Sequence, residues 1–194
     1  MRIIAGEAKG RKLRSPNTKG TRPVTDRVRE AVFSTIGSWV VDSVVGDLYA
    51  GSGSFGLEAL SRGASSAVFV ESGRKALQAL HHNVSDVGLG GTIIESAVQS
   101  YLDRANHRFH LVFMDPPWDR PTDQMEEELA NLDRLLLPSG EVVVSRRHTD
   151  RVPEPPETWR VATDRRYGDT RIIRYEKVED DDDGPANGIV PGEL

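Results

Sequence analysis

The chain of 194 residues contains no cysteine, which excludes disulfides and thiolate metal ligands. Its histidines do not show the spacing of zinc ligands, so we expect no metal site: His81, His82, His107, His110 and His148. No apolar run approaches the roughly 20 residues of a membrane-spanning helix. The N-terminus also lacks a signal-peptide stretch, so we expect a cytoplasmic protein without a membrane partner.

The net charge is small, but the charged residues are unevenly placed. The formal net charge is −5, and residues 178–194 alone carry six acids and no basic residue. Residues 1–30 carry nine Lys or Arg against three acids. A basic segment of this kind favours a polyanionic partner, and Arg11, Lys12 and Arg14 are its candidates for binding RNA. The alternative is a solvated arm whose cations only keep it soluble.

The order of the apolar patterns predicts an α/β fold. A helix is expected from Thr25 to Ile36, with Gly37 as its stop and with Arg27 and Arg29 on its outer face. Further helices are expected over residues 55–62, 74–87, 98–105 and 123–136, and strands over residues 44–49, 67–70, 92–94, 109–114 and 141–145. Strands that alternate with helices predict a parallel sheet covered on both faces.

The two ends of the chain depart from this alternation. Residues 160–163 and 171–177 predict an antiparallel hairpin that turns at Gly168, and residues 1–14 predict a small hairpin or an extended arm. The predicted organisation is therefore a basic arm and helix (1–37), a Rossmann-like domain (38–178) and an acidic, disordered tail (179–194).

A glycine loop follows the first strand of the predicted sheet. Gly51, Gly53 and Gly56 form G-x-G-x-x-G between a strand and a helix, and Glu71 lies 20 residues after Gly51. Glycines let the backbone approach a ligand, and the acid can accept both hydroxyls of a ribose. The pattern therefore predicts a nucleoside site.

The acid Asp47, just before the loop, bears on which nucleoside is bound. A carboxylate there suits the ammonium group of S-adenosylmethionine, whereas it would repel the pyrophosphate of NAD. No acid or base suited to hydride transfer is evident, so an NAD-dependent oxidoreductase is the weaker alternative.

The stretch from Phe109 to Trp118, FHLVFMDPPW, predicts a buried strand that ends abruptly. Two prolines fix their own φ angles and force extended geometry on the residue before them, so Asp115 lies on a stiff backbone. Asp115 and the Pro116 carbonyl can accept both N–H bonds of an exocyclic amine on a base. Trp118 can stack on that base, which must first leave its helix.

Nearly all of the chain apart from the tail resembles RsmD, the bacterial family that methylates the exocyclic amine of a guanine in small-subunit ribosomal RNA. The resemblance rests on MRIIAG, GRKL, TRPVTDRVREAVFSTIG, DLYAGSGSFGLEALSRGA, VFVE, DPPW and YGDTRIIRYEK. It implies a class I S-adenosylmethionine-dependent methyltransferase fold, a monomer, and small-subunit RNA or a 30S assembly particle as partner.

The resemblance also implies roles for particular residues. Asp47, Gly51, Gly53 and Glu71 match its cofactor positions, while Asp115, Pro116, Pro117 and Trp118 match its amine-binding motif. Arg22, Arg27 and Arg29 fall in its N-terminal signature, which implies RNA binding or closure over the cofactor. Two positions depart from the pattern: Ser96 replaces an aspartate expected at the adenine, and Trp118 replaces a tyrosine or phenylalanine.

Three other functions remain open at this point. The motif is shared by methyltransferases that act on DNA adenine or cytosine, but such enzymes need a target-recognition region for which this chain has no insertion. Enzymes that modify a protein glutamine have NPPY instead of DPPW. A non-catalytic RNA-binding assembly factor would not need an intact Asp115 and glycine loop.

Overall fold

Seven strands form one mixed sheet in the computed structural model, which describes residues 1–16 and 24–178. The strand order is β3-β2-β1-β4-β5-β7-β6. The strands are β1 (Val44–Leu48), β2 (Ser66–Glu71), β3 (Thr92–Glu95), β4 (Phe109–Met114), β5 (Leu136–Arg147), β6 (Trp159–Tyr167) and β7 (Thr170–Lys177). Strands β1 to β5 run parallel and β7 pairs antiparallel with β5 and β6, which confirms the predicted fold class. Arg22 and residues 179–194 lie outside the described residues.

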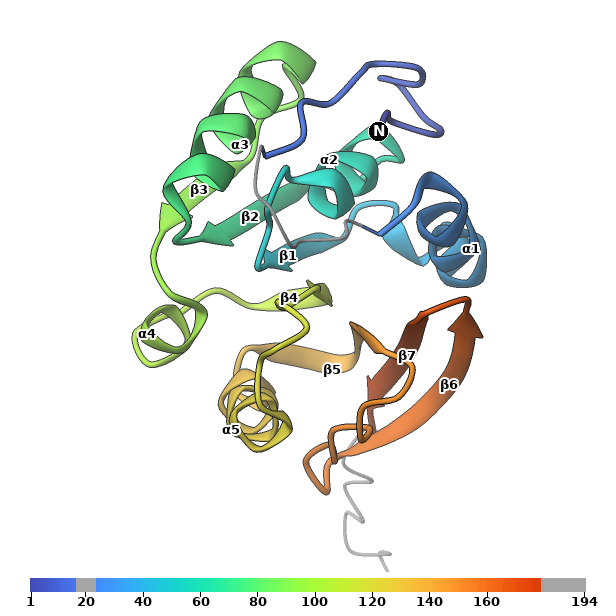
Figure 1. The fold of residues 1–194 in the computed structure, drawn as a ribbon, viewed down its shortest axis with the longest axis vertical. Coiled ribbons are helices and arrows are strands. Elements are labelled where there is room, and N and C mark those ends of the chain that lie inside the picture. The colour runs from blue at the N-terminus through green and yellow to red at the C-terminus, as the bar shows by residue number, and fades with distance from the viewer. Residues whose placement is uncertain (17–23, 179–194) are drawn as a thin grey trace, which may run out of the picture.

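Helices cover both faces of the sheet (Figure 1). They are α1 (Asp26–Ile36), the short 3₁₀ helix η1 (Gly37–Val40), α2 (Ser54–Ser61), α3 (Arg74–Val87), α4 (Val98–Leu102) and α5 (Thr122–Asp133). Helices α1, α2 and α3 share one core with Leu111 and Phe113 of β4. Helices α4 and α5 share the other with Val112 and Met114. Strand β4 is buried on both faces because its side chains alternate between these two cores.

Helix α1 begins at the predicted cap, but its buried face is wider than the sequence suggested. The Thr25 hydroxyl accepts from Val28 N at 3.3 Å, and Gly37 follows the helix with φ of 62°. The prediction that Arg29 lies on an exposed face with Arg27 is wrong, because Arg29 is completely buried. Arg29 lies four residues before Phe33 and seven before Ile36, so it falls on the stripe that packs against the core.

The buried Arg29 guanidinium is held by groups from the N-terminal segment and α2. It donates to the Arg2 carbonyl and, at 3.1 Å, to Asp26, and it lies 3.9 Å from the buried Glu58 carboxylate. Burial lowers the pKa of Arg29, while Asp26 and Glu58 oppose that shift. Its location makes Arg29 a part of the packing between α1 and α2 and removes it from the RNA-binding candidates.

The sequence allowed either a small hairpin or an extended arm for the first 14 residues, and the structure shows a hairpin-like segment. Arg2 and Lys12 make an isolated antiparallel bridge, and Ile3 and Leu13 are buried in the core shared with α1. The Glu58 carboxylate accepts from the backbone N–H groups of residues 4 and 5 at 2.7 and 3.1 Å. The segment therefore packs on α2 and the sheet domain.

Three predicted boundaries are wrong. Helix α4 ends at Leu102 instead of residue 105, and α5 ends at Asp133 because Leu136 already pairs with Phe109 as the start of β5. The irregular opening of β5, where Ser139 has φ of 57°, hides the strand pattern. Strand β6 runs to Tyr167 instead of residue 163, because its polar second half is held by pairing with β7.

Candidate active site

The carboxyl ends of the parallel strands bring the predicted acids to one edge of the sheet. Asp47 is the penultimate residue of β1, Glu71 is the last residue of β2, and Asp115 follows β4 directly. The register pairs Leu48 with both Val70 and Met114, and Asp115 N donates to the Leu48 carbonyl at 3.4 Å. Ligands of open α/β sheets bind at this edge, so the fold itself assembles the candidate site.

The three glycines of the loop have different physical roles. A side-chain Cβ on Gly56 would lie 2.4 Å from the Phe69 ring, and one on Gly53 would lie 2.6 Å from Leu80, so both positions are needed for close packing. Gly51 has φ of 57°, and its Cβ would meet only the Tyr49 carbonyl, at 3.9 Å. The space beside Gly51 is therefore open for a ligand to approach the backbone.

Asp47 lies beneath the loop and is only 2% exposed. Its Oδ2 accepts from Gly56 N at 2.8 Å, which ties the end of β1 to the first turn of α2. The pKa of Asp47 is raised to about 8, mainly by burial and in smaller part by the Asp115 and Glu71 carboxylates, while the Gly56 bond and Arg29 oppose the shift. Asp47 therefore holds a proton in much of the protein at neutral pH, and a cationic ligand beside it would favour the ionised carboxylate.

Glu71 fixes the other side of the loop through its two carboxylate oxygens. Oε2 accepts from Gly51 N at 2.9 Å, and Oε1 accepts from Ser72 N and Gly73 N at 2.8 and 2.6 Å. Each carboxylate oxygen can accept more than one hydrogen bond, so Glu71 retains capacity for a ribose hydroxyl. Its predicted ligand contact stays a prediction, while its part in shaping the loop is shown.

Asp115 faces the same space from β4. It is partly exposed, while Pro116 is buried and Pro117 is exposed. Burial of the carboxyl raises the pKa of Asp115 to about 6, and the Ser145 hydroxyl at the end of β5 opposes that shift. Asp115 is therefore mainly ionised at neutral pH yet close to the range in which a carboxylate exchanges a proton.

Trp118 is half-buried and has a partner that the sequence did not indicate. The guanidinium of Arg147, the last residue of β5, lies 4.9 Å from the centre of the Trp118 ring. A cation over one face of the indole restricts its orientation, and an aromatic ring can still stack through its second face. The register of β4 on β5 brings the two residues together, which explains why local patterns missed Arg147.

A buried network joins the glycine loop to the segment after the DPPW motif. Tyr49, which follows β1 with φ of 62°, donates its hydroxyl to Glu128 Oε1 at 2.6 Å. Arg120 donates to the same oxygen, and its own carbonyl accepts from Arg146 at 3.0 Å. Glu128 is completely buried in α5, but its sequence neighbours Glu126 and Glu127 are also acidic, so the sequence carried no signal for it.

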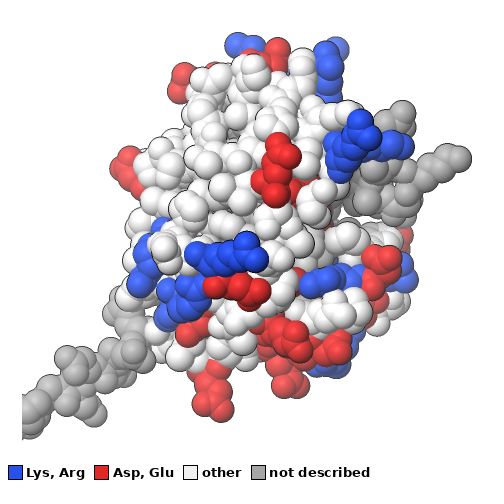
Figure 2. Space-filling model, turned by 90° about the vertical axis from the view of Figure 1, so that its left-hand side faces the viewer, with Lys and Arg blue, Asp and Glu red and all other residues white. Residues whose placement is uncertain are grey.

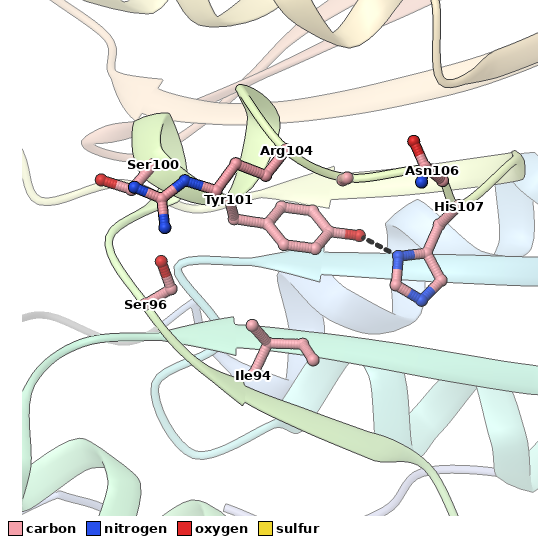
Figure 3. Close-up of a pocket in the computed structure, with 8 residues that line it drawn as sticks. Ile94, Ser96, Ser100, Tyr101, Arg104, Asn106 and His107 are labelled. Atoms are coloured by element: carbon pink, nitrogen blue, oxygen red, sulfur yellow. Dashed lines mark hydrogen bonds between the residues drawn. The ribbon is translucent and has the colours of Figure 1, made fainter.

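Ser96, the predicted adenine neighbour, borders a cavity of about 560 Å³ that lies along α4 (Figure 3). Ile94 and Tyr101 line it as well, and Tyr101 OH is hydrogen-bonded to His107 Nδ1 at 2.8 Å. The other predicted cofactor residues do not line this cavity. Ser96 N donates to the Glu71 carbonyl at 3.0 Å, so Ser96 lies beside the end of β2, and its contact with adenine stays a prediction.

The exposed cations among the predicted RNA-binding residues lie on two elements, the N-terminal segment and α1. Arg11, Lys12 and Arg14 are exposed, and Arg11 donates to the Asp86 carbonyl in α3 at 2.9 Å. Arg27 is exposed on α1. The described residues contain no cluster of three or more potential metal-ligating side chains, and no helix among them is long and apolar enough to cross a membrane.

Comparisons with known proteins agree with this arrangement. The sequence profile of the family described as conserved hypothetical protein 95 matches residues 1–176. Ribosomal RNA small subunit methyltransferase D of Escherichia coli strain K12 is 33% identical over 178 residues, which cover 91% of this chain and 90% of that protein.

Solved structures with similar folds include yhhF from Escherichia coli. It has a TM-score of 0.82 at 33% identity and covers 92% of this chain and 98% of its own. SMU.776, solved in complex with SAH, has a TM-score of 0.67 at 11% identity over 81% of this chain and 50% of its own, a likeness that shows the fold alone.

Proposed function

The chain belongs to the conserved hypothetical protein 95 family, the RsmD family that its sequence resembles, and on that premise we propose its reaction and substrate. The protein transfers a methyl group from S-adenosylmethionine to the exocyclic N2 amine of a guanine in small-subunit ribosomal RNA. The RNA is bound free or within a 30S assembly particle.

The observation that carries this proposal is the meeting of Asp115 with Asp47 and Glu71 at one edge of the sheet. The register that pairs Leu48 with Val70 and Met114 sets the ends of these three strands side by side, and Asp115 N donates to the Leu48 carbonyl. An acceptor for an amine therefore lies beside an acidic, glycine-lined nucleoside site. A methyl transfer needs that proximity because the nitrogen and the methyl carbon must approach in line.

The same charge supports S-adenosylmethionine over NAD. Asp47 and Glu71 lie where the ligand's cationic and ribose groups would be held, with Gly51 leaving room for the backbone to approach. A dinucleotide would bring a negatively charged pyrophosphate against these carboxylates. When bound, S-adenosylmethionine supplies an electrophilic methyl group on a positively charged sulfur.

The protein's own residues prepare the guanine nitrogen. Asp115 and the Pro116 carbonyl accept its two N–H bonds, which turns the lone pair toward the methyl carbon. The N–C bond forms as the S–C bond breaks, the bonding pair stays on sulfur, and the nitrogen then loses one proton. Asp115 stabilises the positive charge on nitrogen during transfer, and its pKa of about 6 suits it to accept that proton.

Trp118 holds the plane of the base during this step. Stacking on an aromatic side chain contributes about 1–3 kcal/mol per base in single-strand binders. The Arg147 guanidinium on the indole keeps the ring in place, so the base meets a prepared surface. The network of Tyr49, Glu128 and Arg120 holds the loop that carries this surface.

The experiment that tests the function uses RNA that lacks the modification. Purified protein with labelled S-adenosylmethionine is given small-subunit RNA and subunit particles from cells lacking the enzyme, and the product is digested to nucleosides. We expect label in N2-methylguanosine. Label in an adenine or cytosine product would refute guanine as the target, and unlabelled RNA and particles despite cofactor binding would refute methyl transfer.

A further inference from the structure

A cavity of about 590 Å³ lies between the first half of α1 and the tip of the β6–β7 hairpin. Figure 1 shows α1 beside that tip. Arg27, Val28 and Ala31 line the cavity from the helix, and Arg166 and Tyr167 line it from the hairpin. Its volume lies within the range of ligand sites, roughly 300–1,000 Å³. We call this cavity the hairpin cleft.

The charged residues that line the hairpin cleft are all basic. Its described lining contains Arg27 and Arg166 and no acid. Arg27 has no hydrogen bond or ion pair within the described part of the chain, and Arg166 uses only Nε, which donates to the Gly168 carbonyl at 2.8 Å. By contrast, Arg160 and Arg171 on the same hairpin are paired with Glu176 and Asp164 at 2.8 and 2.5 Å.

On another side of the molecule, basic residues lie among acids (Figure 2). Figure 2 shows the side of the molecule that carries α3, β3 and α4, where Lys and Arg side chains lie in separate groups with Asp and Glu between them. An extended polyanion would meet mixed charge on that side. The hairpin cleft has the concave shape and the free cations that phosphates require.

The hairpin tip that lines the cleft lies at the same edge of the sheet as the end of β5. Thr170, just after the hairpin tip, pairs with Arg147 of β5, and His148 N donates to the Asp169 carbonyl at 2.9 Å. Arg147 in turn lies on Trp118. A chain of direct contacts thus links the tip of the hairpin to the surface proposed to hold the target guanine.

Tyr167 supplies a fixed aromatic edge to the hairpin cleft. It is half-buried and packs against the core shared with α1, and Gly168 after it turns the chain with φ of 62°. A ring that is held on one side by the core loses little freedom when a base stacks on its other side. Aromatic side chains beside cations are the usual means of binding unpaired nucleotides.

We propose that the hairpin cleft binds the unpaired RNA nucleotide next to the target guanine. Arg27 and Arg166 contact its phosphates from the two walls, and Tyr167 stacks on its base. The inference rests on the proposed function and extends it, because it assigns the RNA path to the α1 and hairpin side of the active site. It also assigns a phosphate contact to Arg27, a residue that the sequence had grouped with the cations of the N-terminal signature.

The test for the two arginines measures RNA affinity against salt concentration with the full chain. The double variant Arg27→Gln and Arg166→Gln is expected to reduce the salt slope of binding to unmodified small-subunit RNA by about 1.4, which is about 0.7 for each lost single-strand phosphate contact. Affinity for S-adenosylmethionine, measured by calorimetry, is expected to stay unchanged.

A matched control separates a local contact from a general loss of charge. Arg108, before β4, and Arg160, at the start of β6, are exposed at the opposite edge of the sheet. The double variant Arg108→Gln and Arg160→Gln removes the same charge and is expected to change the slope much less. Equal slopes in the two double variants would overturn the proposal.

Tyr167 is tested by a pair of substitutions that both keep an apolar side chain. Tyr167→Leu is expected to weaken RNA binding by roughly 5- to 150-fold, the value of one stacked base, while Tyr167→Phe keeps wild-type affinity. Equal binding by both variants would exclude stacking. If the wild type binds the RNA but transfers no methyl group, the proposed reaction fails alone; if it does not bind the RNA, both proposals fail.

Discussion

The rate of methyl transfer is expected to fall at low pH because Asp115 becomes protonated, and this acid limb of the pH profile should be absent in Asp115→Asn. Burial raises the pKa of Asp115 to about 6, and only the ionised carboxylate can accept hydrogen bonds from the amine with both oxygens. The active form therefore predominates above that pKa and is lost as pH falls through it. At one pH unit below the pKa, only about one tenth of the protein is ionised at Asp115.

The size of the effect follows from the loss of a fixed acceptor in the active site. Asp115→Ala is expected to lower kcat by about 100- to 1,000-fold, the usual cost of removing one preorganised group from a transition state. Asp115→Asn keeps one acceptor oxygen without the charge, so its loss should be smaller and should not vary with pH. Affinity for S-adenosylmethionine should change by only a few fold, because Asp115 contacts the amine.

The assay is the pH dependence of kcat/KM for RNA at saturating S-adenosylmethionine, from about pH 5 to about pH 8, which reports groups of the free enzyme. Asp119, an exposed acid in the same loop, provides the control, and Asp119→Asn should keep the limb. A limb that survives in Asp115→Asn, or an equal loss of cofactor affinity and turnover in Asp115→Ala, would refute the assigned role.

Two further predictions concern the cofactor loop. Because the pKa of Asp47 is raised to about 8, binding of the cationic cofactor should release a proton and should tighten as pH rises toward 8. Calorimetry in buffers of different ionisation enthalpy measures the proton release, and Asp47→Asn should abolish it. Tyr49→Phe removes a 2.6 Å hydrogen bond from the buried Glu128 and should lower the free energy of unfolding by about 1–3 kcal/mol in urea titrations. Tyr167→Phe, whose hydroxyl has no hydrogen bond within the described residues, is the control, and an equal effect in both variants would contradict the role of the network.

Much of the fold could be predicted because its signals are local. The apolar run Leu111 to Met114, stopped by two prolines, favoured a strand buried on both faces, and the glycine spacing after Asp47 marked a strand-to-helix turn at a ligand site. The boundary between α5 and β5 could not be found this way. Leu135 and Leu136 suit a buried helix as well as a buried strand, and only pairing with β4 decides between them.

The candidate site divides in the same manner. Asp115 and its prolines were evident because their chemistry is contiguous in the chain. Arg147, Glu128 and Tyr167 were not, since each acquires its role from a residue far away in sequence. Arg147 is a single arginine at the end of a strand, and Glu128 is one of three consecutive glutamates. The sequence around each residue therefore does not indicate its partner.

The sequence by itself determined the order of the elements, the glycine loop and the DPPW motif, because periodicity, backbone restriction and residue chemistry act over a few neighbouring positions. Only the tertiary structure decided that Arg29 is buried between α1 and α2 while Arg27 remains exposed at the hairpin cleft. The physical reason is that burial and pairing depend on which surfaces meet. Two arginines in one short helix therefore have opposite environments, and the fold assigns them to packing and to the proposed RNA path.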